Sequence, residues 1–504
     1  MMAQELISAK SAELHQIVEE VVTIVSDGVQ EGMPIHKVEL KVFRRLLEAG
    51  HAALQLLVDC LGDGDLGEEH QLPDGRTLKR SSDVQKRPYV SIFGELDIKR
   101  YVYMEREGQK IELAAVDARL ALPEGKFSYV LQDWDQSFAM EQPFAKVGQT
   151  VERILGLKQY VDSLEHTNRK MAQKVESFHL SQEAPPADEE GAIFVETADG
   201  KGVPIRKSAD APAIHDHRRR KGPKPGRKRM ATIGAVYSID PFRRTPEEVV
   251  ESLFRDPQQE RPKRSRPRPC HKRIRAILNH TNAAGEEIDG RATVFRWISG
   301  EMAQRHVEGK PIVCIMDGEE SLWSMRDTVQ EDVSMVDVLD LLHVTPRLWD
   351  AASLFYSRDS AAAENFVKDR VLRILRGEVE SVIRGLRRMR TTHGLRGKKR
   401  TDLETICGYF EKNRHRMRYD EYLAAGYPIA SGVIEGACRH VVKDRLERTG
   451  MNWIREGAQA MLDLRCVYLT DQWDEFNVFR IETETERLYP YRQTLEPVLW
   501  STAA

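Results

Sequence analysis

AIFVETADG (residues 192–200) and PIVCIMDG (residues 311–318) are two apolar runs that each end in Asp-Gly. Short apolar runs bounded by turn residues are typical of buried β-strands. Three further stretches favour strands: ATIGAVYSID (231–240), HKRIRAILNH (271–280) and VDVLDLLHV (336–344). For residues 271–280, the periodicity alone does not distinguish a strand from a helix. Five candidate strands between residues 192 and 344 predict a sheet at the centre of this region.

Helical patterns separate the third, fourth and fifth of these strands. RATVFRWISGEMAQRHVEG (291–309) and ESLWSMRDTV (320–329) carry apolar residues at helical spacing. Three strands, a helix, a strand, a helix and a strand predict an α/β core with a mixed sheet of the RNase H-like type. Its first part is residues 191–345, an all-helical insertion follows at 346–421, and residues 422–470 return as its second part.

The chain before this core is predicted to be mainly helical. Its expected parts are a helical region (1–60), a small β-containing unit with a hairpin (61–128), a helix-turn-helix region (129–178) and a Pro- and acid-rich linker (179–190). In the helix-turn-helix, Asn168, Arg169 and Lys170 are expected to face outward, toward DNA. An ordinary helical hairpin is the alternative. The C-terminal tail (471–504) shows no clear pattern.

Composition narrows the class of protein. The chain has 504 residues, a net charge of −3 and six cysteines. The cysteines show no CxxC spacing, which fits a reducing compartment and argues against a disulfide framework or a zinc ribbon. The N-terminus does not resemble a signal peptide, and no apolar run is long enough to span a membrane. We therefore expect a soluble, cytoplasmic protein.

The two Asp-Gly pairs are the candidate catalytic feature. Acids at the carboxyl ends of neighbouring strands, here Asp199 and Asp317, converge at one edge of a sheet. Like charges so close repel each other, and a divalent cation would neutralise them. Oxygen ligands favour magnesium or manganese, and two such ions suit phosphodiester chemistry. Asp-Gly alone more often marks a simple turn.

Further acids and a histidine are candidates for the same site. A third ligand is expected on a later helix, where Glu435 in SGVIEGACRHVVKDR is one of several possible acids. Arg439 and Lys443 follow Glu435 at helical spacing, as phosphate contacts or as a surface salt-bridge ladder. Asp340 and His343 follow the fifth strand, and Asp340 competes for the metal-ligand role. His343 has a structural role as its alternative.

A basic segment, HRRRKGPKPGRKR (217–229), joins the first two core strands. Beside a phosphodiester site we expect it to contact nucleic acid, with binding that weakens steeply as salt rises. A solvated flexible loop is the alternative. The candidate nucleic-acid-binding residues in it are Arg218, Arg219, Arg220, Lys221, Arg227, Lys228 and Arg229.

The catalytic half resembles transposases of bacterial insertion sequences, specifically the ISKra-type family, and more distantly the Mutator-like elements. The stretches that carry the resemblance are ADGKGVPI (198–205), IGAVYSIDPFRRTPEEVVESLF (233–254), VCIMDGEESLW (313–323), VLDLLHVTPRLWDAASLF (338–355) and YLAAGYPIASGVIEGACRHVVKDRLERTGMNWIREGAQAMLDLR (422–465). It implies an RNase H-like fold with a catalytic DDE triad of Asp199, Asp317 and Glu435, which holds two Mg²⁺ or Mn²⁺ ions. Asp340 and His343 become accessory residues.

The resemblance also implies what the protein binds. We expect it to cut DNA at element ends, to join the freed 3′ hydroxyl to target DNA, and to act as a homodimer or larger multimer. Arg439, Lys443 and Arg445 would hold phosphates, and Trp323 and Trp453 would either stack on a base or pack internally. Family members often carry a cysteine-bearing ribbon in the N-terminal half, but residues 104–125 have no cysteine, so we expect no zinc. A DNA-binding protein without activity and a nuclease without strand transfer are the alternatives.

Overall fold

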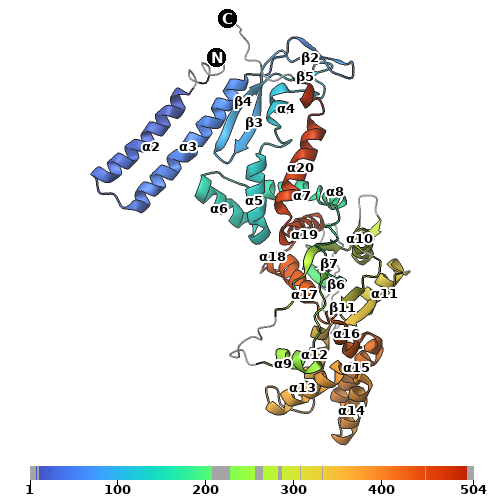
Figure 1. The fold of residues 1–504 in the computed structure, drawn as a ribbon. Helices are drawn as coiled ribbons and strands as arrows, with labels where there is room; N and C mark the ends of the chain where they lie inside the picture. Colours follow the sequence, from blue (N-terminus) through green and yellow to red (C-terminus); the bar gives the residue numbers. More distant parts are fainter. Residues whose placement is uncertain are drawn as a thin grey trace, which may run out of the picture. The chain divides into compact units, whose positions relative to one another are not determined.

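The computed structural model describes residue 7 and residues 11–206, 228–255, 265–281, 286–306, 308–331, 333–448 and 450–495. The chain forms two compact units: one comprises Met1–Lys174 with Trp473–Ala504, and the other Val175–Gln472 (Figure 1). Among the described residues, no helix has both the length and the apolar character that crossing a membrane requires.

The second unit is built around a five-stranded mixed sheet. Its strands are β6 (Ile193–Pro204), β7 (Lys228–Ile239), β8 (Cys270–Leu278), β11 (Ile312–Met316) and β12 (Val336–Leu339). They lie in the order β12-β11-β6-β7-β8. β6, β7 and β8 pair antiparallel, whereas β11 runs parallel to both β6 and β12. All five predicted strands are therefore present, and residues 271–280 are a strand rather than a helix.

Two strand ends differ from the prediction. β6 continues past Asp199-Gly200 to Pro204, because its last residues stay paired with β7 beyond the point where β11 ends. β12 ends at Leu339, five residues before the predicted end. The carboxylate of Asp340 accepts a hydrogen bond from the Leu342 amide and so begins the next helix. The turn prediction at Asp199-Gly200 and the strand prediction for residues 341–344 were wrong.

Both faces of the sheet are covered by helices. Alternate residues of β6 divide between two cores: Val195 packs with the helices that follow β12, and Phe194 packs with α10 and α11. The helices and short strands of this unit are α8 (Val175–Ser181), α9 (Pro246–Leu253), β9 (His280–Thr281), β10 (Glu287–Ile288), α10 (Gly290–Arg305), α11 (Glu320–Val329), α12 (Leu341–Ser353), α13 (Ala361–Leu375), α14 (Val379–Thr392), α15 (Gly397–Asn413), η1 (Arg414–Arg416), α16 (Tyr419–Ala425), α17 (Gly432–Ala437), η2 (Cys438–Lys443), α18 (Asp444–Leu446) and α19 (Arg455–Leu469). The stretch after β12 is helical, as predicted.

The first unit contains a helical hairpin, two small sheets and a helical cluster. Its elements are α2 (Ala12–Gln30), α3 (Ile35–Leu61), β1 (Glu69–Gln71), β2 (Thr77–Arg80), β3 (Gln85–Ser91), β4 (Gly94–Arg100), β5 (Tyr103–Met104), α4 (Ala115–Leu120), α5 (Tyr129–Glu141), α6 (Phe144–Leu155), α7 (Val161–Ala172), α20 (Trp473–Leu488) and η3 (Arg492–Thr494). The predicted hairpin is β3–β4. The C-terminal tail, whose sequence shows no clear pattern, contains α20, whose Trp473 and Asn477 both donate to Asp133 of α5.

The predicted helix-turn-helix corresponds to α6 and α7. Gly156 ends α6 with a φ of 75°, a left-handed conformation that glycine adopts without strain. Asn168 does not face outward as predicted: it is buried and donates to the Gln136 side chain at 2.9 Å. Lys170 forms an ion pair with Glu124 at 2.8 Å. DNA binding by these helices stays a prediction.

Asp135 of α5 gives the first unit a testable pH dependence. Its side chain is 3% exposed, and burial raises its pKa to about 7. The folded state therefore holds an extra proton between about pH 4 and pH 7, so stability falls as the pH rises through that window. We expect Asp135→Asn to remove this loss and to stabilise α5 by more than about 1 kcal/mol at pH 8. Hydrogen exchange of the α5 amides at pH 5 and pH 8 measures this, and the same pH dependence in both proteins would contradict it.

Candidate active site at the ends of three strands

The sheet register brings three acids to the same level. Met316, the last residue of β11, pairs with Ala198 of β6 on one side and with Leu339 of β12 on the other. The residue after each of these is an aspartate: Asp317, Asp199 and Asp340. Neighbouring strands lie about 4.8 Å apart, so the three acids follow one another across the sheet. This level is where β11 and β12 end and β6 continues.

Asp317 and Asp199 influence each other electrostatically. Burial raises the pKa of Asp317, and the charge of Asp199 raises it further, whereas a hydrogen bond from the Glu319 amide and the charge of His343 lower it. That amide lies 2.9 Å from Asp317 Oδ1. Asp199 Oδ1 accepts from the Gly200 amide at 2.6 Å. The two half-buried carboxylates are thus the close pair that the sequence predicts.

Asp340 is fully buried, and both of its oxygens are occupied by protein groups. Oδ1 accepts from the Leu342 amide at 2.8 Å. Oδ2 accepts from the Ser431 hydroxyl at 2.8 Å and from the Ser431 amide at 3.2 Å. Burial raises the pKa of Asp340. Asp340 therefore ties the end of β12 to the residue that precedes α17, an anchoring position that fits the accessory role better than the ligand role.

The helical segment that carries Glu435 packs against the β6 strand. It starts as α17 and continues as η2, a π-helical turn, and α17 and η2 both contact β6. Cys438 of this turn is buried, and its thiol donates to Asp199 Oδ2 at 3.3 Å. Burial raises the pKa of the Cys438 thiol, and the charges of Asp199 and Glu435 add to the effect. Glu435 thus lies beside the cysteine that contacts Asp199, although its own side chain is exposed.

Arg465 of α19 stabilises the π-helical turn. Its buried guanidinium donates to the carbonyl of Val441 at 3.1 Å and to the carbonyl of His440. A π-helical turn leaves carbonyls outside the α-helical pattern, and these need other donors. The role of Cys438 and Arg465 has no signal in the sequence, because both contacts join residues that the fold alone brings together.

The site residues fit a divalent cation in part. Two carboxylates at one edge, with the pKa of Asp317 raised partly by its neighbour, form a hard-oxygen donor pair of the kind that magnesium and manganese prefer. Within the described ranges, no group of three or more His, Cys, Asp or Glu side chains is arranged to hold a metal ion. The structure therefore places Asp199 and Asp317 together and brings the helix of Glu435 to them, with the Glu435 side chain outside a three-ligand cluster.

The helical insertion covers the Asp317 turn. A Cβ atom at Gly318 would lie 2.3 Å from a ring carbon of Tyr409 of α15, so only glycine fits there. Burial raises the pKa of Tyr409 to about 12, and the nearby charge of Asp317 contributes. The guanidinium of Arg347 lies 4.9 Å from the centre of the Tyr409 ring. Tyr409 and Arg347 are neighbours of the site that the sequence reasoning missed.

His343 and the two candidate tryptophans lie near the site in different ways. The charge of His343 lowers the pKa of both Asp317 and Asp340, which places its half-buried ring beside them. Trp323 is fully buried, and its indole donates to the Asp317 carbonyl at 2.6 Å. Trp453 is half-buried and donates to the Leu446 carbonyl at 3.1 Å. Trp323 is thus an internal packing residue that fixes the Asp317 turn, not a stacking surface.

The three side chains predicted to contact phosphates differ in their exposure to solvent. Arg439 is 70% exposed with Asp444 at 3.8 Å, and Lys443 is exposed. Arg445 is fully buried with its guanidinium 5.0 Å from the Trp453 ring centre, so its predicted role at DNA phosphates is wrong for this conformation.

The basic segment between β6 and β7 is described only at its end. Lys228 begins β7 and forms an ion pair with Glu447 at 2.6 Å, and Arg229 beside it is exposed. The predicted contacts at Arg218, Arg219, Arg220, Lys221 and Arg227 lie outside the described residues. Whether this segment binds nucleic acid stays a prediction.

A scan of the chain against protein-family models finds no match, and a search of the curated proteins finds no significant one.

Proposed function

We propose that the chain is a DDE-type DNA transposase of the ISKra-type family, with an RNase H-like core. The observation that carries the proposal is the pair of carboxylates, Asp199 and Asp317, at the level where β11 ends beside β6. An antiparallel trio of strands followed by two parallel strands, with helices between them, supports the RNase H-like interpretation. The all-helical stretch before Glu435 supports the interrupted core that the resemblance implies.

Three acids would hold the metal ions in this proposal. Asp199 and Asp317 would share them, and Glu435 would complete the set after a change in the position of its exposed side chain. Two Mg²⁺ or Mn²⁺ ions supply charge neutralisation at the attacking and leaving oxygens of a phosphodiester. Asp340 holds Ser431 and thereby the start of the helix that carries Glu435. Tyr409 and Trp323 restrict the position of the Asp317 turn.

The exposed cations on η2 and at the start of β7 suit a polyanion. Arg439 and Lys443 follow Glu435 on η2, and both are exposed. Arg229 is exposed at the start of β7, which pairs with the end of β6 beyond Asp199. Phosphate contacts by such residues release counterions, so DNA binding should weaken as salt rises.

A strand-transfer assay tests the proposal. Duplex DNA from each side of the reading frame, cut beforehand so that it ends in a 3′ hydroxyl, is incubated with the chain, Mg²⁺ and plasmid target. We expect joined products that carry the labelled 3′ end. The matched control replaces the 3′ hydroxyl with a 3′ deoxy end, which removes the nucleophile and should abolish joining while leaving DNA binding intact.

The outcomes separate the alternatives. Hydrolysis of intact ends without joined product would contradict the transposase and point to a nuclease. Binding without cleavage or joining would point to a DNA-binding protein. Joining at equal rates with unrelated duplex ends would contradict the recognition of element ends.

A further inference from the structure

The first helix of the hairpin α2–α3 has two apolar stripes. One stripe is half-buried against α3 and consists of Leu14, Ile17, Val21, Ile24 and Gly28. The other is exposed and consists of Val18 (51%), Val22 (66%), Val25 (49%) and Val29 (79%). In both stripes the spacing alternates between three and four residues, the pattern of helices that pack along a seam. A helix with two such seams suits a bundle of more than two helices.

α3 has the same arrangement. Its half-buried stripe against α2 includes Val38 and Val42, and Val38 approaches Gly28 so closely that a Cβ there would lie 3.0 Å away. Its exposed stripe consists of Ile35 (79%), Phe43 (38%), Leu46 (54%) and Leu57 (49%). The exposed acid Glu39 separates Ile35 from Phe43, and Gly50, which lies against the Phe93 ring, separates Leu46 from Leu57.

The two exposed stripes lie on the same side of the hairpin. At about 100° per residue, the exposed stripe is turned from the half-buried one by roughly 90°, in the same rotational sense on both helices. α2 and α3 run antiparallel (Figure 1). In an antiparallel pair, equal rotations in the same sense point to the same side. The seven stripe residues within 18–29 and 35–46 therefore form one surface, which we call the outer face, and Leu57 lies beyond it.

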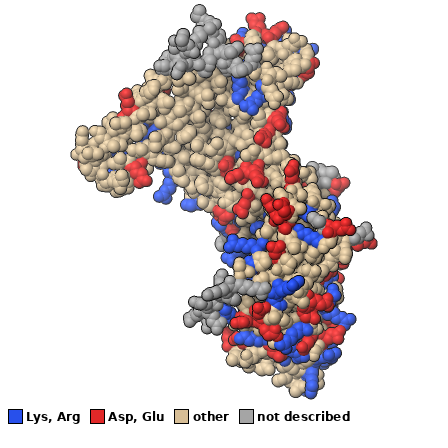
Figure 2. All heavy atoms as spheres, in the orientation of Figure 1, with Lys and Arg blue, Asp and Glu red and all other residues tan. Residues whose placement is uncertain are grey.

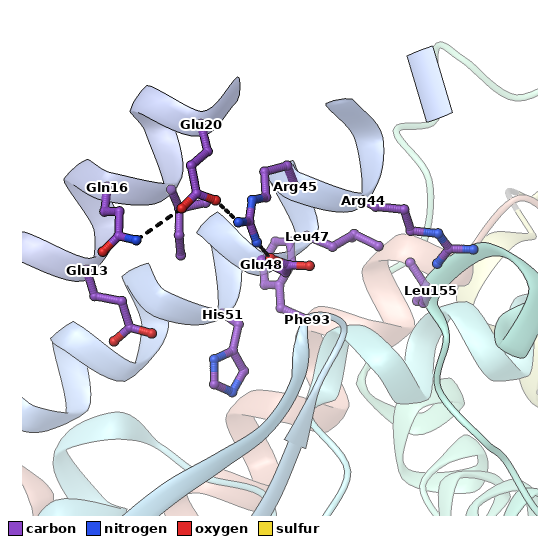
Figure 3. Close-up of a pocket in the computed structure, with 11 residues that line it drawn as sticks. Glu13, Gln16, Glu20, Arg44, Arg45, Leu47, Glu48, His51, Phe93 and Leu155 are labelled. Carbon is purple, nitrogen blue, oxygen red and sulfur yellow. Dashed lines mark hydrogen bonds and ion pairs between the residues drawn. The ribbon is translucent and has the colours of Figure 1, made fainter. Parts of the chain in front are cut away.

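The opposite side of the hairpin is polar. There, α2 and α3 line a cleft of about 570 Å³ with Phe93 of the β3–β4 hairpin (Figure 3). Glu20 and Glu48 both pair with Arg45 in this cleft, and His51 contacts the Glu95 carbonyl at 2.8 Å. By contrast, Figure 2 shows a broad uncharged surface over the hairpin, with few charged groups at its margins. The hairpin is thus polar where it meets its own unit and apolar on the outer face.

We infer that the outer face binds the outer face of a second copy of this chain, forming an antiparallel four-helix bundle. A surface of two antiparallel seams is self-complementary about a twofold axis, as an isologous dimer requires. Two helical hairpins stacked on such seams are an established bundle geometry. This inference concerns assembly and does not depend on the proposed chemistry.

The area of the outer face is sufficient for a dimer. α2 has 19 residues. At about 1.5 Å per residue and 10 Å between helix axes, the face measures roughly 28 Å by 20 Å. Pairing two copies would cover roughly 1,100 Å² in total, above the ~1,000 Å² expected of a specific interface. The exposed valines and leucines lose water contact only if such a partner is present.

Sedimentation of the full chain without DNA tests the inference. We expect the wild type to have the mass of two chains at micromolar concentration. Val22→Lys and Leu46→Lys each place a charge on the outer face, so each should raise the dimer Kd at least about tenfold. The double variant should have the mass of one chain. The matched control is Gln16→Lys, which adds the same charge to α2 on its polar side and should leave the dimer intact.

The measurement has clear contrary results. A wild type with the mass of one chain would overturn the inference and indicate that another part of the same chain covers the outer face. A double variant that stays dimeric would place the interface elsewhere. Both substituted residues are exposed in the single chain, so circular dichroism of the variants should show unchanged helix content. If the lysine variants lose helix, Val22→Ser and Leu46→Ser replace them. We expect these serine variants to raise the dimer Kd by a smaller factor.

Discussion

We expect Asp317→Asn to lower the rate of the proposed DNA cleavage by on the order of 10³-fold or more, equivalent to about 4 kcal/mol in the barrier. The substitution keeps the shape of the side chain and its acceptor for the Glu319 amide. The substitution removes one of the two neighbouring negative charges, on β6 and directly after β11, that would attract a cation. It should therefore weaken the binding of a divalent cation between them. The measurement is single-turnover cleavage as a function of Mg²⁺ concentration, with DNA affinity determined separately in Ca²⁺.

Glu319→Gln is the control for this effect. Glu319 lies two residues further along the same turn, is exposed, and accepts from the Ser321 hydroxyl at 2.6 Å. Glu319→Gln removes a charge of the same sign from the turn but leaves both carboxylates of the pair in place. Because the charge of Glu319 also raises the pKa of Asp317, we expect a loss of cleavage much smaller than that of Asp317→Asn. Equal losses in both variants would show that general electrostatics of the turn matter, and full activity of Asp317→Asn would exclude Asp317 as a metal ligand.

We expect Asp340→Ala to destabilise the second unit by about 3 kcal/mol and to lower the proposed DNA cleavage. The change leaves the Leu342 amide, the Ser431 amide and the Ser431 hydroxyl without their buried acceptor. Loss of a helix cap costs about 1 kcal/mol, and each unsatisfied buried donor about 1 kcal/mol or more. Thermal unfolding should begin at least about 5 °C lower. Because Ser431 precedes the helix of Glu435, cleavage should fall even at temperatures where the variant is folded.

Asp350→Ala provides the comparison for this second effect. Asp350 lies on the same helix, α12, but its side chain is exposed. We expect its melting temperature and its cleavage rate to match the wild type. Asp340→Asn keeps one acceptor oxygen and should give an intermediate melting temperature. An unchanged melting temperature in Asp340→Ala would refute the anchoring role.

The sequence was a good guide to the core because local composition and burial agree there. The five strands contain apolar or β-branched residues at half or more of their positions, and all except β12 are buried along most of their length. The ends were less predictable. Asp199-Gly200 matches a turn, but β7 offers paired partners as far as Lys228, and those hydrogen bonds extend the strand. After β12, the carboxylate of Asp340 caps the N-terminus of α12, so residues 341–344 are helical rather than extended.

The candidate site was predictable only where it follows from strand order. Asp199 and Asp317 lie at the same level because β6 and β11 pair in parallel with Ala198 opposite Met316, although only β11 ends there. Arg445 was expected to hold a phosphate because of the resemblance alone, and the structure buries it beside Trp453. Tyr409 and Cys438 reach the site from 92 and 121 positions after Asp317, and no local pattern announces such contacts.

The return of α20 to the first unit has a consequence for synthesis on the ribosome. Trp473 and Asn477 complete the surroundings of Asp133, but they are made about 300 residues after Lys174. At roughly 5–20 residues per second, that interval lasts on the order of 15–60 s. Val175–Gln472 is contiguous and can fold as it emerges, while the earlier segment waits with an open surface on α5. The nascent chain can therefore complete the first unit only after it has synthesised all of the second unit.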